Sequence, residues 1–119
     1  MATGMQINNI AIPSPMDERG IYLFDTPLLA RNGRGAAVAA PYSVLQWQFD
    51  YLPLDTTGLA WWVTTLLGGA LSAEFTQAKF FNFLGTLTTY SHCTVYRPTV
   101  GRIQDGLAWD VAVTIEWIY

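Results

Sequence analysis

Residues 107–119 restrict the fold of this chain more than any other feature. Apolar side chains recur there at every second position: Leu107, Trp109, Val111, Val113, Ile115, Trp117 and Tyr119. A period of two is typical of a β-strand with one buried face. Such a strand would span roughly 43 Å, whereas strands of about five or six residues are usual. We therefore predict a long strand that lines the core with its odd-numbered side chains, Trp109 and Trp117 included.

Two segments in the middle of the chain have similarly regular patterns. Residues 45–51 alternate apolar and polar side chains, which predicts a strand that ends at Pro53. The apolar residues Leu59, Trp62, Val63, Leu66 and Leu67 share one face of an α-helix, and the glycines at 68 and 69 would end it. We therefore expect one short flanking α-helix over about residues 56–68. Trp61 lies off its apolar stripe, either folded onto the rim of the core or exposed as a subunit contact.

Shorter elements are expected between these. Aromatic and β-branched residues predict strands near residues 21–24, 72–76 and 89–97, and Gln104-Asp105-Gly106 is typical of a turn. The phenylalanines at 80, 81 and 83 fit neither period, so we expect them in a loop. Together the patterns predict a mainly β fold, a β-sandwich or barrel with one flanking helix.

The first forty residues differ from the rest. Prolines at positions 13, 15 and 27 argue against one long helix or a central strand, because proline cannot donate a ladder hydrogen bond. Residues 31–35, Arg-Asn-Gly-Arg-Gly, are typical of a flexible loop. We therefore expect a single domain, residues 1–119, in which residues 1–40 form an extended N-terminal arm and loop and residues 42–119 form the β-sandwich core.

The composition is apolar for a soluble domain of this size. Hydrophobic residues make up 51% of the 119 residues and charged residues only 13%, about half the usual share. Small domains bury a smaller fraction of their surface than large ones, so this excess favours a subunit of an assembly over a free monomer. An arm without a packing pattern of its own also needs a neighbour to order it. We therefore expect a homo-oligomer.

No combination of residues predicts a site for chemistry. His92 and Cys93, the single histidine and cysteine, are adjacent in a predicted strand and would point to opposite faces, so they cannot form a nucleophile pair. Asp110 and Glu116 are six residues apart, which is roughly 20 Å along a strand and too far for a glycosidase pair. The sequence predicts a protein that is not an enzyme and that has no cofactor and no metal site.

Charge and hydropathy argue against further classes. Six Lys and Arg against nine Asp and Glu leave a net charge of −3, which disfavours nucleic-acid binding through a basic patch. The longest apolar stretch, residues 59–71, is interrupted by threonines and glycines, so we expect no membrane span. We therefore expect neither specific nucleic-acid binding nor membrane association.

The predicted elements of residues 42–119 follow one another in a characteristic order. An alternating strand, Trp47-Gln48-Phe49-Asp50-Tyr51, leads through Leu-Pro-Leu to a short amphipathic helix that ends at a glycine. An aromatic segment with Phe75 follows, and the C-terminal strand has the form Trp-x-Val-x-Val-x-Ile-Glu. This series resembles small tail proteins of long-tailed bacteriophages, of the minor tail protein M and distal tail protein type. The resemblance implies a β-sandwich or barrel that assembles into rings around the tail axis and has no catalytic residues.

We therefore expect a structural virion protein, made in the host cytoplasm and located in the tail, that joins the tail tube to the tail tip or hub. Its expected partners are further copies of the chain in a ring and the neighbouring tube and hub proteins. Candidate subunit contacts are Ile7, Ile10, Ile12, Ile21 and Tyr22 from the arm, Arg31 and Arg34 from the loop, and Trp61 from the helix. A loop arginine suits this role because its planar guanidinium binds a carboxylate bidentately.

Two alternatives stay open. Other virion parts, such as a tail-tube, head–tail connector or capsid-decoration protein, also form rings or lattices from β-rich subunits. A carbohydrate-binding β-sandwich module would instead stack sugars on exposed aromatic rings. With the other tryptophans predicted in the core, Trp61 is the tryptophan left for that role. A binding module would be a monomer that responds to glycans, whereas a ring protein would oligomerise.

Overall fold

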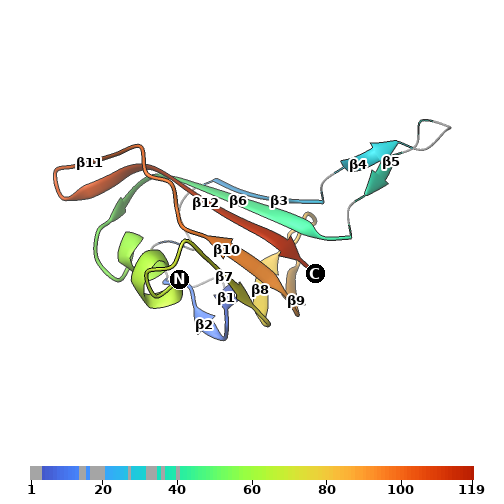
Figure 1. Ribbon diagram of the computed structural model, residues 1–119, viewed down its shortest axis with the longest axis horizontal. Coiled ribbons are helices and arrows are strands. Elements are labelled where there is room, and N and C mark those ends of the chain that lie inside the picture. Colours follow the sequence, from blue (N-terminus) through green and yellow to red (C-terminus); the bar gives the residue numbers. More distant parts are fainter. Residues whose placement is uncertain are drawn as a thin grey trace.

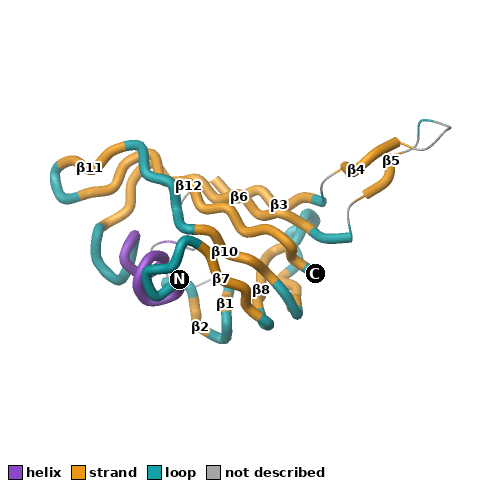
Figure 2. The backbone as a smooth tube through the Cα atoms, in the orientation of Figure 1, coloured by secondary structure: helices purple, strands orange, loops and turns teal. Residues whose placement is uncertain are grey.

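Two antiparallel sheets packed face to face form the body of the protein (Figure 1, Figure 2). The computed structural model describes residues 4–13, 16, 21–26, 28–31, 35, 37–39 and 41–119. The principal extents of the molecule are 54, 28 and 27 Å, and a two-stranded hairpin projects along the longest direction. The predicted mainly β, sandwich-like fold is confirmed.

The elements are short apart from two strands. In the described residues they are β1 (Gln6–Ile7), β2 (Ile10–Ala11), β3 (Ile21–Asp25), β4 (Leu28–Arg31), β5 (Ala37–Ala39), β6 (Ser43–Pro53), η1 (Trp61–Leu66), β7 (Ser72–Phe75), β8 (Ala78–Phe81), β9 (Leu87–Tyr90), β10 (Cys93–Tyr96), β11 (Arg102–Gln104) and β12 (Leu107–Ile118). The strands predicted near residues 21–24 and 72–76 are confirmed as β3 and β7.

The larger sheet is built around the long strands β6 and β12, which pair antiparallel along most of their length. Its strand order is β3-β6-β12-β10-β7, and β11 pairs with the start of β12. Alternation places three apolar pairs on the buried face: Leu45 with Ile115, Trp47 with Val113 and Phe49 with Val111. The two strands with the clearest period of two in the sequence are therefore the centre of the fold.

The alternation of buried residues does not continue to the ends of β12. Asp110 and Trp117 have φ values of +54° and +53°, in the left-handed region. Near Trp117 the register with β6 also shifts. The buried positions consequently change to Ala108 and Ile118, Trp109 is half-buried, and Trp117 is 44% exposed. The prediction that both tryptophans line the core is wrong because it assumes an uninterrupted extended strand.

The smaller sheet closes the other side of the core and has the order β2-β1-β8-β9. β1 and β2 form a hairpin, and the two asparagines of its turn, Asn8 and Asn9, both have positive φ, as a tight hairpin turn requires. Ile7 and Ile12 are 0% and 1% exposed in the common hydrophobic core. The expected extended arm is therefore corrected for residues 4–13, which form part of the sandwich.

The segment predicted as one strand over residues 89–97 forms two strands in different sheets. β9 pairs with β8 in the smaller sheet, whereas β10 pairs with β12 and β7 in the larger. The chain crosses between the sheets at Ser91 and His92. The phenylalanine cluster that was expected in a loop also lies partly in β8, where Phe80 is fully buried.

The helix is shorter than predicted and is a π-helix, η1, rather than an α-helix over residues 56–68. A π-helix has hydrogen bonds between residues five apart, so such residues lie closer to one face than they do in an α-helix. Trp61 therefore shares a face with Leu66, and Trp62 with Leu67, and all four are buried. The positive φ values of Gly68 and Gly69 follow the helix, as expected for its end.

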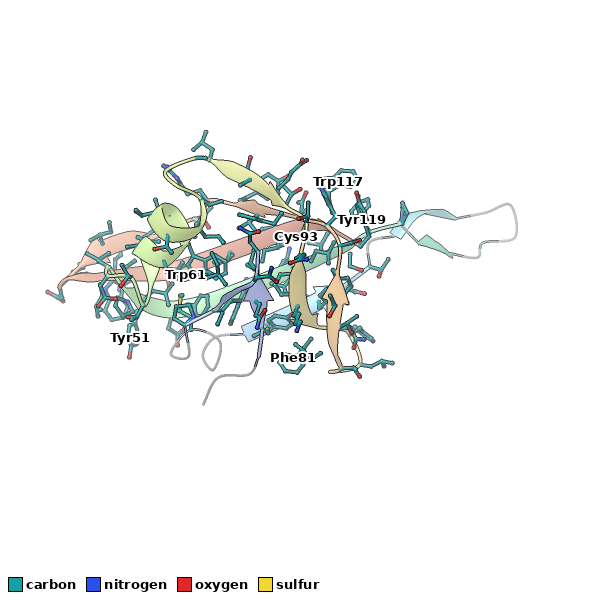
Figure 3. The ribbon with its side chains drawn as sticks, turned by 90° about the horizontal axis from the view of Figure 1, so that it is seen from below. Tyr51, Trp61, Phe81, Cys93, Trp117 and Tyr119 are labelled. Carbon is teal, nitrogen blue, oxygen red and sulfur yellow. The ribbon has the colours of Figure 1, made fainter. Side chains whose placement is uncertain are left out.

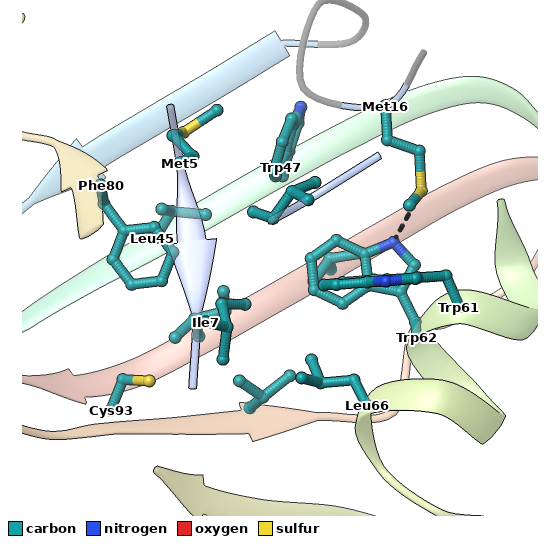
Figure 4. Packing of buried hydrophobic residues seen from close by; sticks show 14 of the residues in the cluster. Met5, Ile7, Met16, Leu45, Trp47, Trp61, Trp62, Leu66, Phe80 and Cys93 are labelled. Carbon is teal, nitrogen blue, oxygen red and sulfur yellow. Dashed lines mark hydrogen bonds between the residues drawn. The ribbon is translucent and has the colours of Figure 1, made fainter. Parts of the chain in front are cut away.

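The chain entering η1 turns tightly against Pro53. A Cβ atom at Gly58 would collide with the Pro53 carbonyl oxygen, so only glycine fits there. Within the core the Trp62 indole N–H donates to the sulfur of Met16, with 3.0 Å between the two atoms (Figure 4). Trp61 packs edge-to-face on Trp62, with 4.8 Å between ring centroids. These contacts join the N-terminal segment to the helix.

Candidate assembly interface

The hairpin of β4 and β5 forms a two-stranded sheet of its own. Its backbone pairs Leu28 with Ala39 and Arg31 with Ala37, and neither strand pairs with another strand in the described residues. Figure 1 shows it extending away from both sheets. A lone two-stranded hairpin is marginally stable at best in water. Its position therefore suits a contact with another molecule.

The sequence of this hairpin is apolar and positively charged. Residues 36–40 read Ala-Ala-Val-Ala-Ala, and β4 reads Leu-Leu-Ala-Arg. Between Asp25 and Asp50 the chain has two arginines, Arg31 and Arg34, and no carboxylate. Arg31 ends β4, whereas Arg34 lies outside the described residues. Of the two arginines predicted as contacts, Arg31 is thus assigned to the hairpin.

The chain leaves and rejoins the larger sheet at one place, which is the base of the hairpin. Asp25 of β3 pairs with Val44 of β6, so the two chain ends leave the sheet side by side. The hydroxyls of Thr26 and Ser43 are hydrogen-bonded at 3.0 Å. The hairpin segment is therefore joined to the body at a single place on the larger sheet.

An aromatic cluster of Tyr42, His92, Trp117 and Tyr119 lies beside this base (Figure 3). Tyr42 packs on Trp117 with 4.2 Å between ring centroids, and His92 stacks on Tyr119 at 4.7 Å and 11°. Trp117 and Tyr119 remain 44% and 56% exposed. The rings therefore form a partly solvent-exposed surface that residue periodicity did not predict.

His92 holds this end of β12 in place. Its Nδ1 donates to the Trp117 carbonyl oxygen at 2.7 Å, since a carbonyl can only accept. The His92 backbone N–H also donates to the Tyr119 carbonyl, and the Tyr119 N–H donates to the His92 carbonyl. These contacts give His92 a structural role.

Most of the arm residues proposed as contacts are used inside the chain's own fold. Ile7, Ile12 and Trp61 are buried in the core. Ile10 and Tyr22 are partly buried against it. Of the two alternatives for Trp61, the structure therefore places it on the core.

Tyr22 is held at the edge of the core by its hydroxyl. This hydroxyl donates to the Phe81 carbonyl at 2.9 Å, and burial raises the pKa of Tyr22 above its ordinary value. Ile21 begins the same strand, β3.

The outer side of the larger sheet carries an acidic face, defined here as Asp25, Asp50, Glu74 and Glu116. Each of them directly follows a buried or half-buried residue of its strand, namely Phe24, Phe49, Ala73 or Ile115. The cations in the part of the chain with described side chains point elsewhere: Arg97 donates to the Gly69 carbonyl at 2.6 Å, Arg102 lies over the Trp109 ring, and Lys79 belongs to β8 of the smaller sheet. The acidic face is thus electrostatically complementary to the arginine-bearing hairpin.

An apolar tip, Phe83 and Leu84, projects from the turn between β8 and β9. These side chains are 70% and 85% exposed. The turn is ordered by the Asn82 side-chain oxygen, which accepts from the Leu84 N–H at 2.9 Å and the Thr86 N–H at 3.1 Å. The tip is a second exposed feature that sequence periodicity missed, although Asn82 and Gly85 are typical turn residues.

The groups that could perform chemistry are dispersed. Burial raises the pKa of the Cys93 thiol to about 12, which disfavours the reactive thiolate. No group of three or more His, Cys, Asp or Glu side chains that could bind a metal occurs among the described residues. A shallow depression of about 200 Å³ over β1 and β8 is lined by polar groups such as Gln6, Gln77 and Lys79, without a carboxylate or thiol.

The helical residues that the structure describes include no segment with the length and hydropathy needed to span a bilayer. No protein-family model, curated protein or solved structure matches this chain. Function must therefore be argued from the exposed features of the fold.

Proposed function

We propose that the protein is a structural subunit of a phage tail and assembles into a ring through the β4–β5 hairpin. The observation that carries the proposal is this hairpin, which extends from the sandwich and pairs with no other strand in the described residues. The assignment to a phage tail rests on the order of the predicted elements, which resembles that of small tail proteins. An apolar composition with 13% charged residues also supports burial against neighbours.

The asymmetry of the molecule favours a head-to-tail contact. The hairpin lies at one end of the 54 Å axis, so its surface differs from that of the sandwich that would receive it. Contacts between unlike surfaces form closed rings when the rotation between copies closes. A hairpin that docks on the next copy would meet this requirement, and its arginines would meet carboxylates there.

The acidic face supports a ring with a passage for DNA. Phosphate groups are attracted to clustered cations, and Asp50, Glu74 and Glu116 have no cationic partner in the described part of the chain. The part of this face that the neighbouring hairpin leaves uncovered would line the passage, and its negative charge would let DNA move without binding. The chain's net charge of −3 is in accord with this arrangement.

The proposal is tested by imaging purified protein in the electron microscope and measuring its mass by light scattering. We expect wild-type protein to form rings and the double variant Arg31→Glu/Arg34→Glu to remain monomeric. The charge-matched control Lys79→Glu/Arg102→Glu changes cations outside the hairpin and should still form rings. A wild-type monomer at all concentrations, or equal loss of rings in both double variants, would contradict the proposal.

Carbohydrate binding is a second candidate, favoured by the exposed rings of Trp117 and Tyr119. Each ring packs on a neighbour, with Tyr42 tilted against Trp117 and His92 stacked on Tyr119, and the exposed side of each ring would contact a sugar. The test is tryptophan fluorescence during titration with oligosaccharides. Carbohydrate binding predicts a saturable change that Trp117→Ala removes, in a protein that stays monomeric.

A further inference from the structure

We propose that the outer side of the larger sheet binds a calcium ion between Glu74, Thr94 and Glu116. These residues form one row across three strands, because Thr94 of β10 pairs with Glu74 of β7 on one side and with Glu116 of β12 on the other. Directly opposed residues share one face of a sheet. Two strand spacings separate the backbones of the two glutamates by about 10 Å, with Thr94 midway between them.

The Thr94 hydroxyl is the observation that points to a ligand. Thr94 is 8% exposed, and its Oγ1 atom has no hydrogen-bond partner in the structure. Its neighbours Cys93 and Val95 are fully buried. Val95 pairs with the core residue Ile115, so Thr94 lies on the opposite, outer side with the two glutamates. A buried hydroxyl without a partner is destabilising, and a ligand between the glutamates would satisfy it.

The two glutamates create a local excess of negative charge around this hydroxyl. Neither has a cationic partner within the described residues, and Glu116 accepts only a long hydrogen bond, 3.5 Å, from the Tyr96 hydroxyl. Like charges that flank one residue repel each other. A bound cation would attract both carboxylates, and the Thr94 hydroxyl oxygen would donate a lone pair to it.

The donor atoms select the kind of cation. Carboxylate and hydroxyl oxygens are hard ligands, whereas zinc prefers nitrogen and sulfur. The row offers long carboxylate side chains in an irregular arrangement on an open sheet, which suits the flexible geometry of Ca²⁺ better than the strict octahedron of Mg²⁺. Water would complete the coordination. With so few protein ligands we expect weak binding, with a dissociation constant on the order of 10⁻⁴–10⁻³ M.

All three ligands come from one chain, so the site does not depend on the proposed ring. The test is the melting temperature of the full chain, measured in chelator and then with increasing CaCl₂. We expect a saturable rise of several degrees in wild-type protein, since a ligand that binds only the folded state stabilises it. Thr94→Val and Glu116→Gln should each fold and lose this rise.

Two controls separate a specific site from general screening by salt. Asp50→Asn removes a carboxylate from the same acidic face but outside the row, and should keep the calcium-dependent rise. MgCl₂ at the same concentration should raise the melting temperature much less. The proposal is overturned if calcium on the order of 10 mM leaves the wild-type melting temperature unchanged, if the shift is equal in Thr94→Val, or if magnesium acts equally.

Discussion

The N-terminal segment and the β4–β5 hairpin have similarly irregular sequences, but one lies in the sandwich and the other projects from it. Both are interrupted by prolines or glycines and lack a long alternating pattern. Residues 4–13 nevertheless contribute to the core, whereas β4 and β5 project from the body. The composition of β5 is in accord with this difference. Its sequence, Ala-Val-Ala, offers less apolar surface than the isoleucines and the methionine of residues 4–13, and the free energy of burial scales with that area.

Deletion of residues 1–17 should have the largest effect and should unfold the protein. It removes four core side chains: Met5, Ile7, Ile12 and Met16. Loss of one such side chain costs about 2–5 kcal/mol, and a domain of this size has about 5–15 kcal/mol in total. Circular dichroism should show loss of the β signal. A folded truncated protein would mean that the segment is a dispensable arm after all.

Replacement of residues 28–39 by a short Gly-Ser turn should leave the sandwich folded. The two ends of the hairpin already meet where Asp25 pairs with Val44, so a short turn can join them. We expect the melting temperature of the monomeric sandwich to change by only a few degrees. A loss of folding as large as that caused by the N-terminal deletion would remove the distinction between the two regions.

Met16→Leu should have an intermediate effect because it removes the acceptor of the buried Trp62 N–H. A Met-to-Leu change in a core usually costs less than about 1.5 kcal/mol, and an unsatisfied buried donor adds about 1–3 kcal/mol. The matched control is Met5→Leu, since Met5 is also buried. Urea unfolding should give a lower free energy for Met16→Leu. Equal values would show that the sulfur contact contributes nothing.

Changes at the apolar tip should have the smallest effect on stability. Phe83→Ser/Leu84→Ser alters two highly exposed side chains and leaves the Asn82 hydrogen bonds intact. Exposed substitutions usually change the free energy of unfolding by within about 0.5 kcal/mol. Urea unfolding would measure this. A much larger loss would mean that the tip packs on the body.

The sequence predicts best the elements whose pattern of apolar and polar residues repeats over many positions. The pairing of β6 with β12 follows from two long alternating stretches, and the turn before β12 follows from Asp105 and Gly106, which both have positive φ. Residues 4–13 were not predicted because β1 and β2 have two residues each. A strand that short shows no period. The strand β1 is stabilised by its pairing with β2 and β8 and by the burial of Ile7.

The features of the candidate interface were predicted less well, for local reasons. The alternation predicts Trp117 in the core, but one left-handed residue is enough to change the face on which a strand side chain lies. The spacing of an α-helix predicts Trp61 off the buried stripe, whereas the π-helix that forms buries it. The arginines at 31 and 34 were proposed from the sequence, and the structure adds that Arg31 ends a strand of a projecting hairpin.

The mass of the hairpin-replaced protein in solution tests the central claim most directly. Light scattering after size-exclusion chromatography should give wild-type protein a mass that is a fixed multiple of the 13.2 kDa chain. The variant without residues 28–39 should elute as a folded monomer at the same concentration. An unchanged multiple in the variant would contradict the claim that this hairpin holds the ring together.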